Sequence, residues 1–266
     1  MSAVTTDDIY TTNLGEVGPR VVFFHGLFGQ GKNWTQIAKS LAPDHRVTLV
    51  DMPNHGRSGW TEHLDYVAFA DRLAELFSAE DPVALVGHSM GGKIAMVLAL
   101  RHPELVERLV VVDMSPVVYA NGSEFGGFIA GMQSMDLDRL ERRTDADAAL
   151  AQAAPNTTVR SFLLQNLRRD GDGWRWQPNL DLLARELDVL GSWPEERLGD
   201  VSPYDGRVLW IAGARSPYVT DDYAPAMLRW FPRAARITVK DAGHWVHSEQ
   251  PEIFQQVLRR FLAAGS

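Results

Sequence analysis

The chain has 266 residues, a formal net charge of −8, a sequence pI near 5.5 and no cysteine. It is long enough for one large core, and the lack of cysteine excludes disulfides, thiolate metal sites and a cysteine nucleophile. An acidic chain without a long lysine and arginine cluster disfavours a nucleic-acid partner. No apolar run of about 18 residues and no export signal stand out. We therefore expect a cytoplasmic protein without a membrane partner, a metal or a cofactor.

Short apolar runs, separated by stretches of helical spacing, predict the strands of a parallel sheet. The runs span residues 21–24, 47–50, 83–86, 109–112, 208–211 and 236–239. Between them, stretches such as 66–77 and 93–101 carry apolar residues at the spacing of helices. The fold class is therefore α/β, with a mostly parallel twisted sheet flanked by helices.

The alternation of strands and helices stops between residues 117 and 199, where no convincing strand appears and Arg, Asp, Leu and Trp are frequent. Such a segment is too long for a loop. We expect a helical cap over 117–199, inserted between strands 6 and 7, on a core made of 1–116 and 200–266. The alternative is a second domain at the side. The cap is favoured because active sites lie at the carboxyl ends of the strands.

The loop after the first predicted strand has the sequence HGLFG, residues 25–29. The backbone N–H groups of a loop between a strand and a helix can stabilise an oxyanion. We expect the N–H of Leu27 to do this together with the N–H of Met90. Phe28 would then face the acyl group, and His25 would hold the loop in place.

The same loop nearly matches a phosphate-binding loop, because Gly26, Gly31 and Lys32 fit the pattern G-x-x-x-x-G-K. The next residue is Asn33, so the hydroxyl that would bind magnesium is missing. A nucleotide hydrolase is therefore disfavoured.

The strongest motif is VALVGHSMGGKIAMVLAL, residues 83–100, which contains G-x-S-x-G between an apolar strand and a helix. In this motif a serine lies at a sharp turn, where side chains at Gly87 and Gly91 would collide with the neighbouring chain. The start of the following helix directs N–H groups towards an oxyanion. Ser89 is therefore the predicted nucleophile.

With this motif the catalytic residues follow the chain order serine, acid, histidine, so the base must come last. His244 lies in a loop after the last predicted strand. An imidazole there would accept the proton of the serine hydroxyl. His247 is the alternative, although we expect it to be an exposed residue at the start of a helix.

The acid is the open question, because its usual place lies about 28 residues before the histidine (244 minus 216 is 28), where this chain has Ser216. Asp113 closes an apolar strand, where a buried charge needs a partner. Asp221 and Asp222 are alternatives, although they look like first-turn residues of a helix. Asp113 is favoured. Ser216 is then either a hydrogen-bond donor to the acid and base or, as we expect, filler of the loop.

The segments HGLFG, VDMPNHGRS, VGHSMGGK, VVDMSPV, GARSPYV and GHWVHSEQP together resemble the YbfF-type esterases of the α/β-hydrolase superfamily. Eukaryotic relatives of that group are mitochondrial abhydrolase-domain proteins. The resemblance implies an α/β-hydrolase fold, hydrolysis of acyl esters or thioesters, and an acid at the position of Asp113. It covers most of the core and fades over residues 121–198.

Aromatic residues of the loops and the cap are candidates for an apolar acyl pocket, although most of those in the cap are expected to pack its helices onto each other. They are Phe28, Tyr119, Phe125, Phe128, Trp174, Trp176, Trp193 and Trp245. The predicted function is hydrolysis of short to medium acyl esters or thioesters through an acyl-enzyme on Ser89. A carbon–carbon bond hydrolase or a lactonase would use the same residues. A non-catalytic ligand-binding member of the fold is the alternative of another class.

Overall fold

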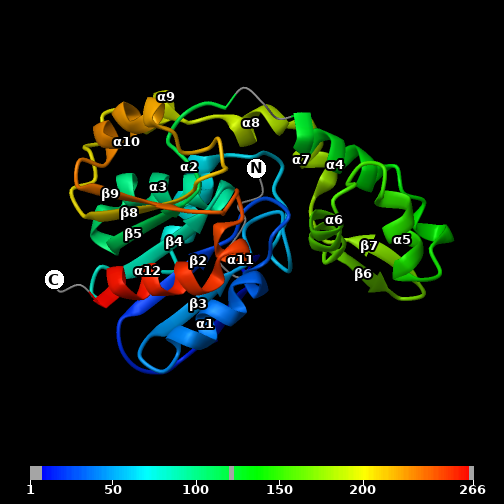
Figure 1. The fold of residues 1–266 in the computed structure, drawn as a ribbon, viewed down its shortest axis with the longest axis horizontal. Coiled ribbons are helices and arrows are strands. Elements are labelled where there is room, and N and C mark those ends of the chain that lie inside the picture. The colour runs from blue at the N-terminus through cyan, green and yellow to red at the C-terminus, as the bar shows by residue number, and fades with distance from the viewer. Residues whose placement is uncertain (1–7, 120–122, 264–266) are drawn as a thin grey trace.

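The computed structural model describes residues 8–119 and 123–263, which are built around a seven-stranded sheet (Figure 1). The strands are β1 Thr11–Leu14, β2 Arg20–Phe24, β3 Arg46–Val50, β4 Val83–His88, β5 Val106–Val112, β8 Arg207–Gly213 and β9 Ala234–Val239. They lie in the order β1-β3-β2-β4-β5-β8-β9, and all neighbours are parallel except β1 and β3. The sheet confirms the predicted α/β class. Strand β1 was not predicted, because its sequence TTNL lacks an apolar run.

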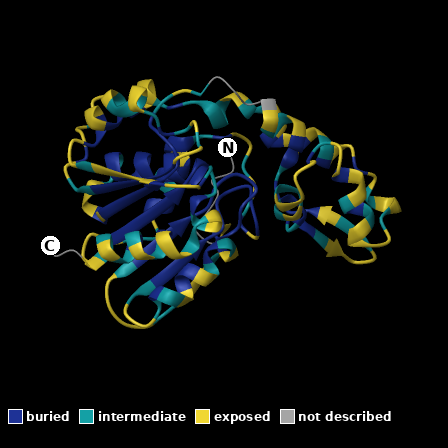
Figure 2. Ribbon diagram, viewed as in Figure 1, coloured by how far each residue is buried: buried dark blue, intermediate teal, exposed yellow. Residues whose placement is uncertain are grey.

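Helices cover both faces of the sheet, which explains why its central strands are apolar on both sides. On one face lie α2 Tyr66–Ala74, α3 Met90–Arg101 and α10 Ala224–Trp230. On the other face lie α1 Thr35–Leu41, α11 Val246–Glu249 and α12 Pro251–Ala263. Figure 2 shows the buried strands between helices whose outer surfaces are exposed. None of the helices in the described part of the chain is long and apolar enough to span a bilayer.

Most of the segment between β5 and β8 forms a group of short elements to one side of the sheet, whereas its last two helices lie along the core, the last one next to α10 (Figure 1). Its helices are α4 Ser123–Gln133, α5 Arg143–Leu150, α6 Thr157–Leu164, α7 Leu180–Arg185, α8 Leu187–Gly191 and α9 Glu195–Leu198. In chain order, β5 and β8 are the fifth and sixth strands of the described sheet. The expected position of the insertion, between strands 6 and 7, was therefore wrong by one strand. Among the described residues a single strand, β1, precedes β2, so the insertion follows the fifth strand of the sheet.

The cap also contains an antiparallel hairpin, although no strand was expected there. It consists of β6 Leu167–Asp170 and β7 Gly173–Trp176. Both strands are short and half-exposed, so they lack the apolar run of a sheet strand. The repeated Asp-Gly pairs in DGDG are a hairpin signal that identifies them.

The register of the sheet brings the ends of β4, β5 and β8 together. His88 pairs with Val112, and Val112 pairs with Ile211. The backbone N–H of Ser89 donates to the carbonyl of Val112 at 3.1 Å, and that of Asp113 donates to the carbonyl of Ile211 at 3.0 Å. Residues that directly follow these strands therefore meet at one edge, where parallel sheets bind ligands.

Candidate active site

Ser89 occupies the sharp turn between β4 and α3. Its φ of 52° and ψ of −121° are a backbone conformation that residues other than glycine rarely adopt. A Cβ atom at Gly87 would lie 2.4 Å from the carbonyl oxygen of Gly91, and one at Gly91 would lie 2.5 Å from that of His25. The two glycines therefore permit the turn, as the sequence predicts. The turn lifts the serine to the edge of the sheet, at the start of a buried helix.

Asp113 and His244 form a direct pair at this edge. Nδ1 of His244 lies 2.8 Å from Oδ2 of Asp113, whose side chain has no exposed surface. The other carboxylate oxygen, Oδ1, accepts a hydrogen bond from the N–H of Gly213 at 2.9 Å. The Asp113 backbone has a φ of 51°, which turns the chain at the end of β5 as Ser89 does at the end of β4. A carboxylate on Nδ1 leaves Nε2 of the imidazole available for proton transfer.

Ser216 belongs to this group, contrary to the expectation that it fills the loop. Its hydroxyl donates to Oδ2 of Asp113, the same oxygen that faces His244. The alternative acids lie elsewhere: Asp221 is exposed and pairs with Arg236 at 2.5 Å, and Asp222 is exposed. The structure thus supports the alternative that the sequence left open, a hydrogen-bond donor to the acid, which was not favoured because a contact between two loops leaves no local pattern.

Two further histidines surround the His244 loop. Nε2 of His88 donates to the carbonyl oxygen of His244 at 2.9 Å, so the residue before the serine holds the histidine loop. The expectation of an exposed His247 was wrong. Its ring stacks on Trp34 with centroids 4.2 Å apart, and burial lowers its pKa to about 3. A group that stays neutral and stacked is a poor alternative base.

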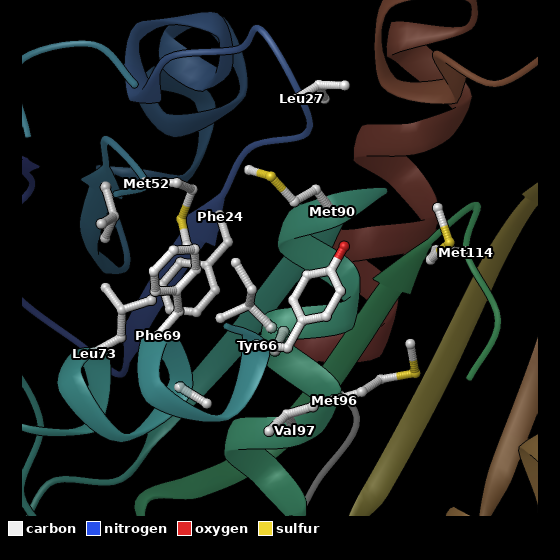
Figure 3. Packing of buried hydrophobic residues seen from close by; sticks show 14 of the residues in the cluster. Phe24, Leu27, Met52, Tyr66, Phe69, Leu73, Met90, Met96, Val97 and Met114 are labelled. Carbon is white, nitrogen blue, oxygen red and sulfur yellow. The ribbon is translucent and has the colours of Figure 1, made fainter. Parts of the chain in front are cut away.

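The two expected oxyanion donors lie close to Ser89. Leu27, Met90 and Ser89 line one cavity, and Figure 3 shows Met90 between Leu27 and Met114. Met90 is the first residue of α3, so its N–H has no acceptor within the helix. The N–H of Leu27 donates no hydrogen bond within the described residues. Both N–H groups are therefore available to a ligand.

His25 holds the loop that carries Leu27, as expected. Its Nε2 accepts a hydrogen bond from the N–H of Met52 at 2.9 Å, and its Nδ1 donates to the carbonyl of Gly26 at 2.8 Å. Burial lowers the pKa of His25 to about 4, which keeps the imidazole neutral. With both nitrogens occupied, the side chain has a structural role.

The partial phosphate-loop motif does not form an open anion site. The N–H of Gly31 donates to Oδ1 of Asp51 at 2.7 Å, and that of Arg57 donates to Oδ2 at 2.9 Å. The N–H of Gly31, which a bound phosphate would need, is thus already used by the carboxylate of Asp51. This arrangement agrees with the expectation that the chain does not hydrolyse nucleotides.

Two cavities in the described part of the chain meet at Ser89, and Leu27 and Phe125 line both. The first, which we call the Tyr119 cavity, has about 460 Å³ of empty space and is lined by Tyr119 and by apolar side chains of the core and cap. The second, the Phe162 cavity, has about 320 Å³ and is also lined by His244. Both volumes include space that is open to solvent.

Most of the aromatic residues predicted to contact the acyl group line these cavities. They are Phe28, Tyr119, Phe125, Phe128 and Trp245. Additional lining residues that the sequence did not indicate are Met114, Val159, Leu187, Leu190 and Tyr218. They come from short cap elements and from loops, whose positions depend on the path of the whole chain.

The prediction was wrong for Trp174 and Trp176, which line neither cavity at Ser89. The indole N–H of Trp174 donates to the carbonyl of Leu140 at 2.9 Å, and that of Trp176 donates to the carbonyl of Met132 at 3.0 Å. Both rings are therefore fixed inside the cap by its own backbone. Trp193 is buried and packs edge-on against Trp230, away from these cavities.

Comparisons with known proteins agree with this architecture. The sequence model of the alpha/beta hydrolase fold matches residues 19–251. The chain is 41% identical to sn-1-specific diacylglycerol lipase ABHD11 of Mus musculus, over 92% of this chain and 81% of that protein. It is 32% identical to esterase YbfF of Escherichia coli, over 91% and 92% of the two chains. A solved marine microorganism esterase superposes with a TM-score of 0.90 at 33% identity, over 96% of this chain and 99% of the other. The chain therefore belongs to the α/β hydrolase fold family, in the group that includes esterase YbfF.

Proposed function

We propose that the protein is a serine hydrolase of carboxylic esters with short to medium acyl chains, acting through an acyl-enzyme on Ser89. The observation that carries the proposal is the buried Asp113 carboxylate 2.8 Å from Nδ1 of His244, with His244 and Ser89 lining one cavity. The names esterase and lipase of the relatives support the same class of reaction.

The first half of the reaction forms the acyl-enzyme. Nε2 of His244 takes the proton of the Ser89 hydroxyl as its oxygen attacks the ester carbonyl. Asp113 fixes the imidazole tautomer and stabilises the imidazolium. The N–H groups of Leu27 and Met90 donate to the oxygen that becomes negative. His244 then gives its proton to the leaving alcohol.

The second half releases the acid. A water molecule loses a proton to His244, attacks the acyl carbonyl and displaces the oxygen of Ser89, which regains a proton from the imidazolium. The same two N–H groups stabilise the second oxyanion. No step requires a metal or a cofactor.

The same residues also suit thioesters, lactones and activated carbon–carbon bonds. Esters with uncharged, apolar acyl groups are favoured because apolar side chains form most of the lining of the Tyr119 cavity. A small-molecule ester is accordingly the proposed partner. The cytoplasmic location expected from the sequence stays a prediction, which cell fractionation tests.

A fluorophosphonate probe tests the proposal, because it phosphonylates an activated serine. We expect stoichiometric labelling of Ser89 in the folded protein and no labelling of Ser89→Ala. Hydrolysis of p-nitrophenyl esters should fall by up to about a millionfold in this variant. A folded wild-type protein that neither reacts with the probe nor cleaves any ester would instead be a non-catalytic binding member of the fold.

A further inference from the structure

Lys93 is a fully buried lysine in α3, the helix that begins directly after Ser89. Its Nζ donates to the carbonyl oxygen of Gly191 at 2.8 Å and also to that of Ser192. It lies 4.9 Å from the ring centre of Tyr119, and burial lowers its pKa to about 7. The proposed reaction does not use this amine, so its burial next to the site calls for another role.

The carbonyls that bind Lys93 lie at the C-terminal end of α8 in the cap. Two other groups bind the same end: the hydroxyl of Tyr66 in the core donates to the carbonyl of Leu190 at 2.8 Å, and the N–H of Tyr119, at the start of the cap, donates to that of Gly191 at 2.8 Å. Carbonyls at the end of a helix have no partners within it and carry a partial negative charge. The amine of Lys93 and the hydroxyl of Tyr66 thus attach the end of α8 to the core, and the N–H of Tyr119 links it to the segment that follows β5.

Helix α8 is also a wall of the reaction site. Leu187, Leu190 and Gly191 line the Tyr119 cavity together with Ser89. His244 lines the Phe162 cavity and is not among the residues of the Tyr119 cavity. Since His244 protonates the leaving alcohol, the alcohol would lie in the Phe162 cavity and the acyl chain in the Tyr119 cavity. Phe28, Phe128 and Trp245, which the sequence analysis expected to contact the acyl group, line only the Phe162 cavity and would therefore face the alcohol.

We propose that Lys93 is a positioning residue for substrate selection, which fixes α8 against the core and so limits the length of the acyl chain that Ser89 accepts. This inference rests on the proposed function, and within it names acyl groups of limited length as the substrate class. The acyl chain would end against Leu187 and Leu190, whose distance from Ser89 depends on the attachment of α8.

Stability alone does not explain the amine. Transfer of a charged group into the interior is unfavourable, and an apolar residue of similar size often stabilises a protein as well or better. Methionine would fill the volume of the Lys93 stem without binding the α8 carbonyls. Lys93→Met is therefore expected to fold, and to differ from the wild type mainly in the attachment of α8.

The test compares kcat and KM of wild type and Lys93→Met for p-nitrophenyl esters from acetate to dodecanoate. With α8 released, the preferred chain should become longer, and the ratio of kcat/KM for the longest ester to that for acetate should rise by about tenfold or more. Tyr66→Phe, which removes one donor to the same helix end, should shift the ratio in the same direction by less. Lys39→Met, an exposed lysine of α1, is the matched control and should keep the wild-type ratio.

The outcomes separate this inference from the proposed function. If wild-type Ser89 reacts with the fluorophosphonate while folded Lys93→Met keeps the wild-type chain-length profile, the role of Lys93 is overturned. If Lys93→Met does not fold, Tyr66→Phe decides in its place: a longer preferred chain supports the inference, and an unchanged profile overturns it. An unreactive wild-type Ser89 would instead overturn the proposed function.

Discussion

Ser216 donates a hydrogen bond to Oδ2 of Asp113, the same carboxylate oxygen that lies 2.8 Å from Nδ1 of His244. The two residues follow the neighbouring strands β8 and β5, and Gly213 donates to the second carboxylate oxygen at 2.9 Å. A fully buried carboxylate requires such donors, because unpaired burial of a charge is costly. The loop after β8, which has Ser216 at the usual position of the acid, therefore donates hydrogen bonds to Asp113 at the end of the neighbouring strand β5.

Replacement of Ser216 by alanine should lower kcat without a comparable change in KM. A hydrogen bond to a charged group contributes about 1.5–3 kcal/mol, which corresponds to a loss of roughly tenfold to a hundredfold in kcat if it orients the acid. Steady-state kinetics with p-nitrophenyl butyrate measure the effect. Ser202→Ala, at an exposed serine ahead of β8, is the control and should behave like the wild type. Equal kcat values in both variants would show that the Ser216 hydroxyl is dispensable.

The catalytic carboxylate should function from residue 216, after β8, as well as from residue 113, after β5. Asp113→Asn is expected to reduce kcat on the order of ten-thousandfold, because an amide no longer stabilises the imidazolium. The position of the Ser216 hydroxyl indicates that a carboxylate at residue 216 can reach the same imidazole. The double variant Asp113→Asn with Ser216→Asp should therefore recover at least about tenfold of the lost kcat.

Two controls frame this transfer experiment. Asp221→Asn removes an exposed acid that pairs with Arg236, and it should retain wild-type kcat. Ser216→Asp alone places two carboxylates together and should be less active than the wild type, because like charges at close range disfavour each other. Wild-type kcat in Asp113→Asn combined with low kcat in Asp221→Asn would reassign the acid.

The Phe162 cavity predicts how the enzyme selects the alcohol of its substrate. Phe162 lines this cavity with Trp245, and their ring centroids are 6.4 Å apart. Phe162→Ala should lower kcat/KM for naphthyl esters by about tenfold relative to ethyl esters of the same acid. Trp174→Phe is the aromatic control, since Trp174 lies outside both cavities. A change of the same size in the two variants would contradict this assignment of the cavity.

Features that depend on local sequence were predictable. The central strands appear as apolar runs because helices bury both of their faces. Ser89 could be identified because its turn excludes side chains at the flanking glycines. Asp113 could be favoured because a carboxylate that ends an apolar strand needs a partner, and the partner it has is His244.

Features that depend on contacts between distant segments were not predictable. The Ser216 hydroxyl reaches an acid more than a hundred residues earlier in the chain. His247 is stacked instead of exposed because α11 packs its ring on Trp34 from another segment of the core. The carbonyls around Lys93 belong to the cap, where short elements have weak periodicity. In each case, tertiary packing determines the role of the residue.

Buried neutral histidines should make the fold sensitive to acid. Burial lowers the pKa of His25 to about 4 and that of His55 to about 3, from 6.5. Below pH 6.5 the unfolded chain therefore binds protons that the folded chain excludes, so the free energy of unfolding falls as pH decreases. The contribution is fully present above pH 6.5, and for His55 it continues to decrease until about pH 3.

Urea unfolding between about pH 7 and 4.5 measures this dependence. Each of the two histidines should contribute a slope of up to about 1.4 kcal/mol per pH unit to the free energy of unfolding. His55→Gln keeps a donor for the carbonyl of Pro53 and removes the titrating ring, so its slope should be smaller than that of the wild type. His63→Gln, at an exposed histidine beside Glu186, is the surface control variant. If the free energy of unfolding of wild type and of His55→Gln changed equally with pH, a contribution from His55 would be excluded. A histidine that stays neutral in the folded protein must give the wild type the steeper dependence.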